Sequence, residues 1–399
     1  MEQSQEMNTK THTSSSKIRI NTNDIAASKY IPKITSRVEE NGVLQFTVEN
    51  MNVSLANALR RVILSEIPTY VFRTFPYNEN KASITANTSR LHNEIIKQRL
   101  SCIPIHISDM EFLYKDYCVE LDVVNDSDTI KYVTTKDFRV KNKVSGKYLI
   151  ESKVHEIFPP NEFTGDYIIL GRLLPKMSEY ADGERLALTC DLDIGTAKEN
   201  GSFNIVSTCT YSLTQDIGKV QEKWAIREQE LVKEGVALAS EDMADAKKDW
   251  MLLDGQRCTK EGSYDFIIET VGVFQNTEIV VKAANIMIDK CTKFISDIQS
   301  GENRIIKSNT LLEHGYDVEL KGETHTLGKV IEWFLFDQHY NEDETVSFVS
   351  FRKVHPHSVD SMIRIGFAED IDEQVVATYF IEAAKKAIAV YTHVREMFV

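Results

Sequence analysis

The chain has 399 residues, of which 42% are hydrophobic and 27% charged, a balance typical of a globular protein with two or three domains. Its 46 basic and 60 acidic side chains give a net charge of −14. That acidity argues against a protein whose main task is coating nucleic acid, because such surfaces need an excess of Lys and Arg. It still allows a place in a nucleic-acid machine whose other chains carry the basic channel.

Two targeting features are not expected. No apolar run approaches the roughly 18 residues that span a bilayer, so we expect no transmembrane helix. Residues 1–17 are rich in Ser, Thr, Gln and Glu, without the apolar stretch that a secretory signal needs, so we expect no export. Residues 1–29 are predicted to form a disordered tail.

A β-hairpin and a helix are predicted next. The dipeptide Asn41-Gly42 separates the runs 34–40 and 43–49, and it supplies the positive φ angles of a type I′ turn. An apolar stripe at i, i+3, i+4, i+7 and i+8 then predicts an amphipathic helix, with Ser54 as its cap and Pro68 just beyond its end. The stripe consists of Leu55, Ala58, Leu59, Val62 and Ile63.

The same pattern recurs near the other end of the chain. A shift of 272 positions overlays the two segments without a gap, placing Phe46 on Val318, Val48 on Leu320, Ser54 on Thr326, Leu55 on Leu327, Val62 on Phe334 and Ile63 on Leu335. Each copy also closes with a long amphipathic helix. Met287 and Phe294 lie on the apolar stripe of the first closing helix, which Gly301 is expected to end, and Ala384 and Tyr391 lie on the second.

This repeat predicts an α+β fold in which two similar units pack as an intramolecular pseudo-dimer. The first unit is expected to be discontinuous, because turn signals indicate a small inserted β-rich domain and a charged stretch indicates surface helices. The predicted ranges are 30–107 and 207–300 for the first unit, 108–206 for the β-rich domain, 215–261 for the charged helical insert, 301–309 for a linker that acts only as a tether, and 310–399 for the second unit.

No constellation typical of an enzyme is present. The chain lacks a G-x-x-x-x-G-K-[ST] phosphate loop, a G-x-S-x-G elbow and an H-E-x-x-H pair. Asp191 and Asp193 come nearest to a metal-binding pair, but a calcium loop would need Gly and Glu where Thr196 and Ser202 stand, so a solvated strand face is the better interpretation. The basic run Arg139, Lys141, Lys143 and Lys147 could contact phosphate, although the wet side of a hairpin explains it more simply.

Metal binding by cysteine or histidine is not expected. His355 and His357 flank a proline without a third ligand, which favours an ordinary loop. The cysteines are scattered without a C-x-x-C pair, which favours reduced, mostly buried thiols in a cytosol-like compartment. They are Cys102, Cys118, Cys190, Cys209, Cys258 and Cys291.

Three motifs carry a resemblance to a known family. They are Asn57-Ala58-Leu59-Arg60-Arg61-Val62-Ile63-Leu64-Ser65-Glu66-Ile67-Pro68, then Asn87-Thr88-Ser89-Arg90-Leu91-His92-Asn93-Glu94 continuing to Gln98-Arg99-Leu100 and Ile103-Pro104-Ile105, and Tyr264-Asp265-Phe266 with Glu269-Thr270-Val271-Gly272. Together they resemble the α-like subunits of RNA polymerase, bacterial α and the third-largest subunit of RNA polymerase II, over nearly all of residues 30–300. His325-Thr326-Leu327-Gly328 and Val354-His355-Pro356-His357 resemble the small partner subunit, the eleventh.

The resemblance implies two α-subunit-type dimerisation units fused head to tail in a non-catalytic subunit. Such a subunit is the platform on which the largest and second-largest polymerase subunits assemble, with small subunits of the tenth-subunit type nearby. It would meet DNA only through the complex, and no membrane or cofactor is expected. The family docks its second-largest subunit where Arg60 and Arg61 lie. Glu94 and Arg99 are expected either in the same interface or as residues that hold the local turn. The closing helices would form the pseudo-dimer core, with Met287, Phe294, Ala384 and Tyr391 at its centre.

Two departures from the family pattern matter. Eukaryotic third subunits commonly carry a zinc-binding cysteine cluster in the inserted domain, whereas this insert offers only Cys118 and Cys190, so no zinc is expected. The sequence ends at Val399 with the second unit's helix, so a promoter-contacting domain like that of bacterial α is not expected. The fusion resembles those of large DNA viruses that transcribe in the host cytoplasm, which implies a viral factory as the location and the virion as a second candidate.

Two other functions compete with this interpretation. One is an enzyme that uses the region of Asp191 and Asp193, which turnover with an added divalent metal would favour. The other is a free dimerisation scaffold outside any polymerase. Purification from the native source separates the scaffold from the polymerase subunit, because a polymerase subunit should return two very large partners in equal amounts.

Overall fold

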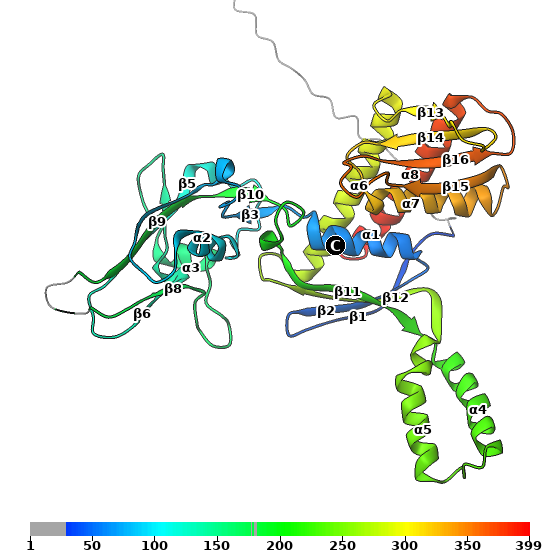
Figure 1. Cartoon of the computed structure of the whole chain (residues 1–399), viewed down its shortest axis with the longest axis horizontal. Coiled ribbons are helices and arrows are strands. Elements are labelled where there is room, and N and C mark those ends of the chain that lie inside the picture. Colours follow the sequence, from blue (N-terminus) through cyan, green and yellow to red (C-terminus); the bar gives the residue numbers. More distant parts are fainter. Residues whose placement is uncertain (1–28, 177, 179–181) are drawn as a thin grey trace, which may run out of the picture.

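The structure is a computed structural model that describes residues 29–176, 178 and 182–399, so the predicted tail lies outside the described residues except for Lys29. It contains several antiparallel sheets and two long helices, arranged as a two-sheet body, a lobe at one side and a projecting helical hairpin (Figure 1). Lys29 already belongs to the body, because its Nζ lies 2.7 Å from Asp337 Oδ2, and the neighbouring Tyr30 hydroxyl donates to the same carboxylate at 2.8 Å.

The first sheet of the body begins with the expected hairpin. Asn41 and Gly42 have φ angles of 52° and 77°, which is the left-handed geometry that the turn requires. The strands β1 (Lys33–Glu40), β2 (Val43–Glu49), β11 (Val206–Gln215) and β12 (Thr259–Thr270) pair in the order β1-β2-β12-β11. Helix α1 (Val53–Ser65) and helix α6 (Asn276–Ser300) pack on this sheet.

The sequence predicted Ser54 as the N-cap of α1 and Gly301 as the residue that ends α6, and the structure corrects the first of these. The cap of α1 is Asn52 rather than Ser54, because the Asn52 side chain accepts a hydrogen bond from the Ser54 backbone N–H at 2.8 Å. Gly301 ends α6 as expected, with a left-handed φ of 76°.

The second sheet of the body repeats the first. Its strands are β13 (Ile305–Lys307), β14 (Gly315–Leu320), β15 (Val346–Arg352) and β16 (Ser361–Phe367), paired in the order β13-β14-β16-β15. Helix α7 (His325–Leu335), a π-helical turn (Phe336–Tyr340) and helix α8 (Glu373–Glu396) complete this half. The 272-residue shift carries Val53, the first residue of α1, onto His325, the first residue of α7. Both halves therefore have one topology, as the repeat predicts.

The predicted tether is part of the second half instead. Ile305, Ile306 and Lys307 form β13, which pairs with β14 and is the counterpart of β1 in the strand order. Asn303 is buried, and its Oδ1 accepts a hydrogen bond from the Lys321 backbone N–H at 3.1 Å. The prediction was wrong because a three-residue edge strand with one exposed face is too short to show an apolar alternation.

One continuous hydrophobic core joins the two halves. It contains buried side chains from both sheets and from α1, α6, α7 and α8, and these helices lie between the two sheets (Figure 1). The most extensive contact between helices is that of α6 with α8, and α1 contacts α7. The core is thus a property of both halves together.

The lobe has a separate core and its own sheets. The strands β4 (Ala82–Asn87), β9 (Glu184–Asp191), β5 (Tyr117–Asn125) and β7 (Arg139–Asn142) form one sheet in that order. Two-stranded sheets join β6 (Lys131–Thr134) to β8 (Ile169–Leu173) and β3 (Thr69–Val71) to β10 (Asp193–Gly195). The lobe also contains helices α2 (Asn93–Ser101) and α3 (Glu151–Ile157).

The chain leaves the body earlier than the sequence predicted. Tyr70, Phe72, Ile96 and Leu100 are buried in the core of the lobe, whereas we assigned residues up to 107 to the first unit. The change of core falls near Pro68, where α1 has ended and β3 begins to pair with β10. The apolar pattern of residues 69–105 shows that these residues are buried but not in which core, so sequence alone misplaced the boundary.

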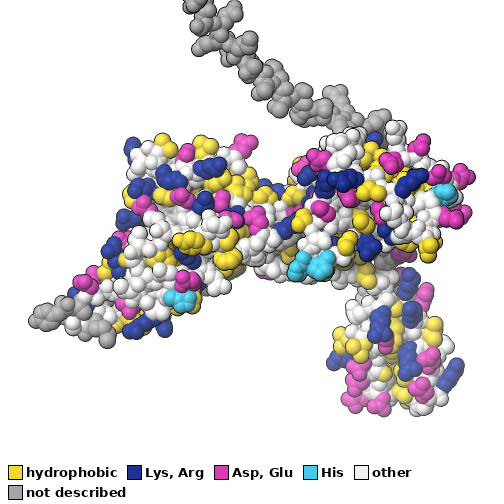
Figure 2. Space-filling model, turned by 45° about the horizontal axis from the view of Figure 1, so that its top comes forward, with side chains coloured by type: hydrophobic (Ala, Val, Ile, Leu, Met, Phe, Trp, Pro, Cys, Tyr) yellow, Lys and Arg dark blue, Asp and Glu magenta, His cyan; other side chains and the backbone are white. Residues whose placement is uncertain are grey.

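The charged insert forms a helical hairpin that projects from the first sheet (Figures 1 and 2). It consists of α4 (Ile217–Lys233) and α5 (Glu241–Leu252), between β11 and β12. Trp224 packs near Trp250 with ring centroids 5.7 Å apart, and Met243 is buried between the helices. Two aromatic anchors and one thioether are enough to hold two amphipathic helices together without a large core.

A substitution tests whether residues 301–309 are structural. We expect Asn303→Ala to lower the free energy of unfolding by about 1–2 kcal/mol, because it removes a buried side chain that accepts a hydrogen bond from the Lys321 N–H. The exposed Asn309, in the same segment, provides the control, and Asn309→Ala should change stability by less than about 0.5 kcal/mol. If urea denaturation shows that the two changes lower the free energy of unfolding equally, residues 301–309 would act as a simple tether after all.

Candidate partner-binding surface and the contacts between the halves

The two arginines of α1 do not share one side of the helix. Arg60 is half-buried, and its guanidinium donates to Asn57 Oδ1 at 2.9 and 3.1 Å. Arg61 reaches the other half of the body, where its Nε donates to Thr326 Oγ1 at 2.9 Å in the first turn of α7. Neighbouring residues on a helix point about 100° apart, so one docking surface cannot use both side chains equally. That both arginines contact one partner stays a prediction, with Arg61 exposed but hydrogen-bonded to the other half.

Glu94 and Arg99 lie on a different part of the molecule. Both are exposed on α2, whose buried side chains Ile96 and Leu100 belong to the core of the lobe. The carboxylate of Glu94 lies 2.9 Å from His92 Nδ1, and its own backbone N–H together with this ring lowers the pKa of Glu94. Figure 1 shows α2 in the lobe and α1 in the body, so the structure does not bring the four predicted interface residues together.

The four residues expected at the centre of the α6–α8 contact share one core. Met287, Phe294, Ala384 and Tyr391 are all buried in the core of the body. The Tyr391 hydroxyl, although fully buried, donates to the backbone oxygen of Leu55 in α1 at 3.1 Å. Burial raises the pKa of Tyr391, which keeps the phenol protonated as a donor. This hydrogen bond joins α8 of one half to α1 of the other.

A buried ion triad between the halves was missed from the sequence. Lys290 of α6 lies 2.9 Å from Glu66 at the end of α1 and 2.9 Å from Glu323 just before α7. The three side chains are only 15%, 12% and 19% exposed, respectively. Burial disfavours the ammonium, but the two carboxylates outweigh it, so the pKa of Lys290 is raised. The spacing of these residues gives no signal, because their contact depends on how the halves dock.

The second half contains a contact equivalent to that between Lys290 and Glu66. The 272-residue shift carries Glu66 onto Gln338, and Lys386 of α8 donates to Gln338 Oε1 just as Lys290 contacts Glu66. Lys386 has no carboxylate in the place of Glu323, and burial lowers the pKa of Lys386. The equivalent contacts therefore differ in charge: the first half holds a buried ion pair and the second a lysine–amide hydrogen bond.

The residues considered for catalysis or metal binding have structural partners. Asp191 pairs with Lys143 at 3.1 Å, and Asp193 pairs with Arg73 at 2.6 Å. Within the described ranges, no group of three or more His, Cys, Asp or Glu side chains could hold a metal ion. Five of the six cysteines are buried free thiols, and Cys102 is exposed. Burial raises the pKa of Cys291 to about 12, so this thiol stays protonated and behaves as an apolar side chain. None of the helices that the structure describes is long and apolar enough to cross a membrane.

Comparison with known proteins assigns this architecture to a family. The profile of the RNA polymerase Rpb3/Rpb11 dimerisation domain matches residues 45–291, which is more than half of the chain. The chain belongs to this family. The match includes α1 and most of α6, the two helices of the first half that make the contacts described above.

Individual relatives of the family are polymerase subunits. The human subunit RPAC1 of DNA-directed RNA polymerases I and III is 22% identical, over 66% of this chain and 83% of its own length. The subunit Rpo3 of Pyrococcus furiosus is 26% identical, over 64% of this chain and 93% of its own length. The RNA polymerase II subunit RPB3 of Schizosaccharomyces pombe is 22% identical, over 70% of this chain and 91% of its own length. These relatives are of the non-catalytic type, which supports a non-catalytic polymerase subunit here.

The triad leads to a stability prediction. Lys290→Met leaves two nearby carboxylates buried without their cation, so we expect the free energy of unfolding at pH 7 to fall by roughly 3 kcal/mol. Lys293→Met, at an exposed position of the same helix, should change it by less than about 0.5 kcal/mol. The pKa of Lys290 is raised above 10.5, so its contribution is complete below that pH and is lost as the pH rises through the folded-state pKa. Denaturation curves in which both variants match the wild type would contradict the triad.

Proposed function

We propose that this protein is the assembly platform of a multisubunit DNA-directed RNA polymerase, with two α-like units, third-subunit-type and eleventh-subunit-type, fused in one chain as a pseudo-dimer. Its task would be to nucleate assembly of the largest and second-largest subunits, with small subunits of the tenth-subunit type binding nearby. The observation that carries the proposal is the family match over α1 and α6, the helices that contact α7 and α8 of the repeated half.

The pattern of contacts supports the pseudo-dimer. Helix α1 contacts its counterpart α7, and α6 contacts its counterpart α8. Contacts between equivalent elements are the mark of a two-fold interface, in which the same surface patch of each partner meets itself. The identical strand orders of the two sheets extend this equivalence beyond the helices.

The lengths of the relatives support the fusion. About two thirds of this chain covers 93% of the Rpo3 relative and 91% of the RPB3 relative. The remaining third of the chain is thus additional to a third-subunit match. The second half, residues 302–399, supplies a further sheet, α7 and α8, which is the complement that a dimerisation unit of this kind needs.

The docking surface for the second-largest subunit is proposed to include Arg60, whereas Arg61 serves the contact between the halves. Arg60 can pair with carboxylates or carbonyl oxygens because its guanidinium has free donors beyond the contact with Asn57. Glu94 and Arg99 would contribute a separate contact on the lobe. With a net charge of −14, the chain would meet DNA only through other subunits.

We also propose a large cytoplasmic DNA virus as the source, because the head-to-tail fusion resembles those of such viruses. The protein would then act in viral factories of the host cytoplasm, with the virion as a second location. Immunogold labelling of infected cells and purified particles distinguishes these compartments, and nuclear labelling alone would contradict the proposal.

Affinity purification of the tagged full chain from its native source tests the function. We expect two very large partners in equal amounts, and we expect Arg60→Glu to reduce recovery of the second-largest subunit at least tenfold, because like-charge contacts at an interface cost several kcal/mol. Lys321→Glu reverses an exposed charge in the second half and should leave recovery unchanged. Recovery of the chain alone, or as a simple dimer, would instead favour a free scaffold.

Cleavage of the chain tests the pseudo-dimer. Gly301 and Glu302 are exposed, so a protease site between them keeps β13 with the second half. We expect the cleaved halves to elute as one complex, because each buried apolar side chain at their contact contributes about 1.5–3 kcal/mol. The covalent link would mainly raise the effective concentration, to the millimolar range for a short linker. A second half that elutes alone as a folded monomer would show that the halves do not depend on each other.

A further inference from the structure

One edge of a central strand in the lobe is only partly paired. Strand β9 pairs with β5 from Cys118 to Asn125, which occupies one edge of β5. On the other edge, β7 pairs only with residues 117–120 of β5. The first residue of β7, Arg139, lies opposite Glu120. The neighbouring strand β6 turns away to pair with β8. Within the described residues, no strand therefore lies beside residues 121–124 of β5 on that edge.

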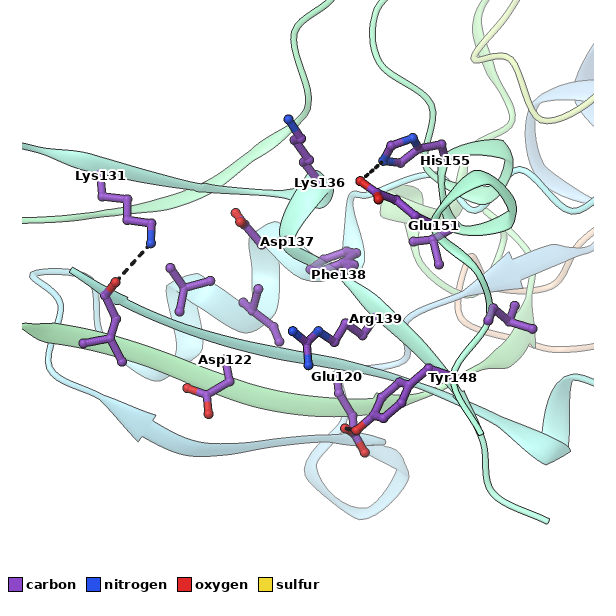
Figure 3. A pocket seen from close by; sticks show the side chains of 15 residues that line it. Glu120, Asp122, Lys131, Lys136, Asp137, Phe138, Arg139, Tyr148, Glu151 and His155 are labelled. Atoms are coloured by element: carbon purple, nitrogen blue, oxygen red, sulfur yellow. Dashed lines mark hydrogen bonds and ion pairs between the residues drawn. The ribbon is translucent and has the colours of Figure 1, made fainter. Parts of the chain in front are cut away.

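A cavity of about 870 Å³ lies beside this unpaired edge of β5 (Figure 3). Five consecutive residues of β5 line it, Glu120 to Val124. Side chains of a strand alternate between its two faces, so five in succession can line one cavity only if the strand edge itself faces it. On the far side lie residues 136–138, from the connection between β6 and β7, and Arg139, the first residue of β7.

The backbone of this edge is available for hydrogen bonding. The Lys131 side chain crosses the cavity, and its Nζ donates a hydrogen bond to the carbonyl oxygen of Val124 at 3.1 Å (Figure 3). The Val124 carbonyl must then point into the cavity. Both backbone groups of a residue in an antiparallel strand point to the same edge, and every second residue shares that edge. The N–H and C=O of Asp122 accordingly face the cavity as well.

The ion pairs of the described residues leave a small excess of positive charge around the cavity. Among these residues, Lys131, Lys136 and Arg139 line it without an ion pair, against the carboxylates of Asp137 and of Glu151, which has only His155 as a neighbour at 3.6 Å. Each carboxylate of the β5 wall already has a cation, since Glu120 pairs with Lys141 at 3.1 Å and Asp122 pairs with Arg185 at 2.7 Å. The guanidinium of Arg139 lies over the Tyr148 ring, 6.0 Å from its centroid.

From this geometry we infer that the open edge of β5 binds an extended acidic segment of another polypeptide, which adds a strand beside residues 121–124. The backbone groups of Asp122 and Val124 would pair with its main chain, and Lys136 and Arg139 would bind its carboxylates. The segment 1–28 of this chain is not acidic, because Glu2, Glu6 and Asp24 balance Lys10, Lys17 and Arg19. Lys131, which caps Val124 in the free protein, would be displaced. The inference does not depend on the proposed polymerase function.

Fluorescence anisotropy with the full chain tests the inference, using a labelled (Glu-Val)3 peptide as the probe. We expect saturable binding that weakens as salt is added, and at least tenfold weaker binding of (Lys-Val)3. Two further acidic peptides carry N-methyl groups at alternate backbone nitrogens, in one of the two possible registers each. The peptide whose methyl groups replace the N–H donors facing β5 should bind at least tenfold more weakly than the unmethylated peptide. This last comparison separates strand pairing from simple charge attraction.

Protein variants complete the experiment. Lys136→Glu with Arg139→Glu should weaken binding of the acidic peptide at least tenfold, whereas Lys223→Glu with Lys248→Glu, two exposed positions on the hairpin, should change it less than twofold. Circular dichroism of each variant checks that it is folded. The inference is overturned if the acidic peptide does not bind, if both N-methylated registers bind as well as the parent peptide, or if a labelled oligothymidylate of equal charge binds more tightly than the peptide.

Discussion

The packing of α6 against α8 is the contact on which the rest of the body depends. Each helix is long and has one apolar stripe, and each sheet-and-helix half would leave that stripe in water if it stood alone. Burying a side chain such as Phe294 or Tyr391 is worth about 1.5–3 kcal/mol, so the several residues along this contact outweigh the cost of ordering two connected halves. The lobe and the hairpin, by contrast, are attached to the first half and have their own anchors.

Polar contacts make this apolar packing specific. A stripe of apolar residues tolerates several docking registers, but the Tyr391–Leu55 hydrogen bond and the Lys290 triad each require one position of the halves. Lys290 must meet carboxylates from both halves, and a displaced register would leave these charges buried and unpaired. At the equivalent place, the second half has the Lys386–Gln338 hydrogen bond instead of an ion pair. The proposed pseudo-dimer is therefore symmetric in topology and asymmetric in charge, as expected for two related units of different type.

Local chemistry was predictable from the sequence, and long-range pairing was not. Asn41-Gly42 and Gly301 specify their own backbone angles, so the hairpin and the end of α6 could be predicted from a few residues. The repeat was visible because buried stripes of equal spacing occur twice. The assignment of Tyr70 to the lobe and the contact of Arg61 with Thr326 depend on partners distant in sequence, whereas the strand Ile305–Lys307 is too short to show a pattern of its own. The open edge of β5 was invisible for the same reason, because a missing pairing leaves no local pattern.

Hydrogen exchange measured by mass spectrometry in increasing denaturant tests the central claim most directly, because it reports the opening free energy of each helix in the intact chain. If one core holds both halves together, the slowest amides of α6 and α8 should exchange with the same opening free energy and the same dependence on denaturant. Lys290→Met should lower both values by the same amount. An α8 that opens at clearly lower free energy than α6, with a smaller denaturant dependence, would contradict the account, because the two halves would then be separate folding units.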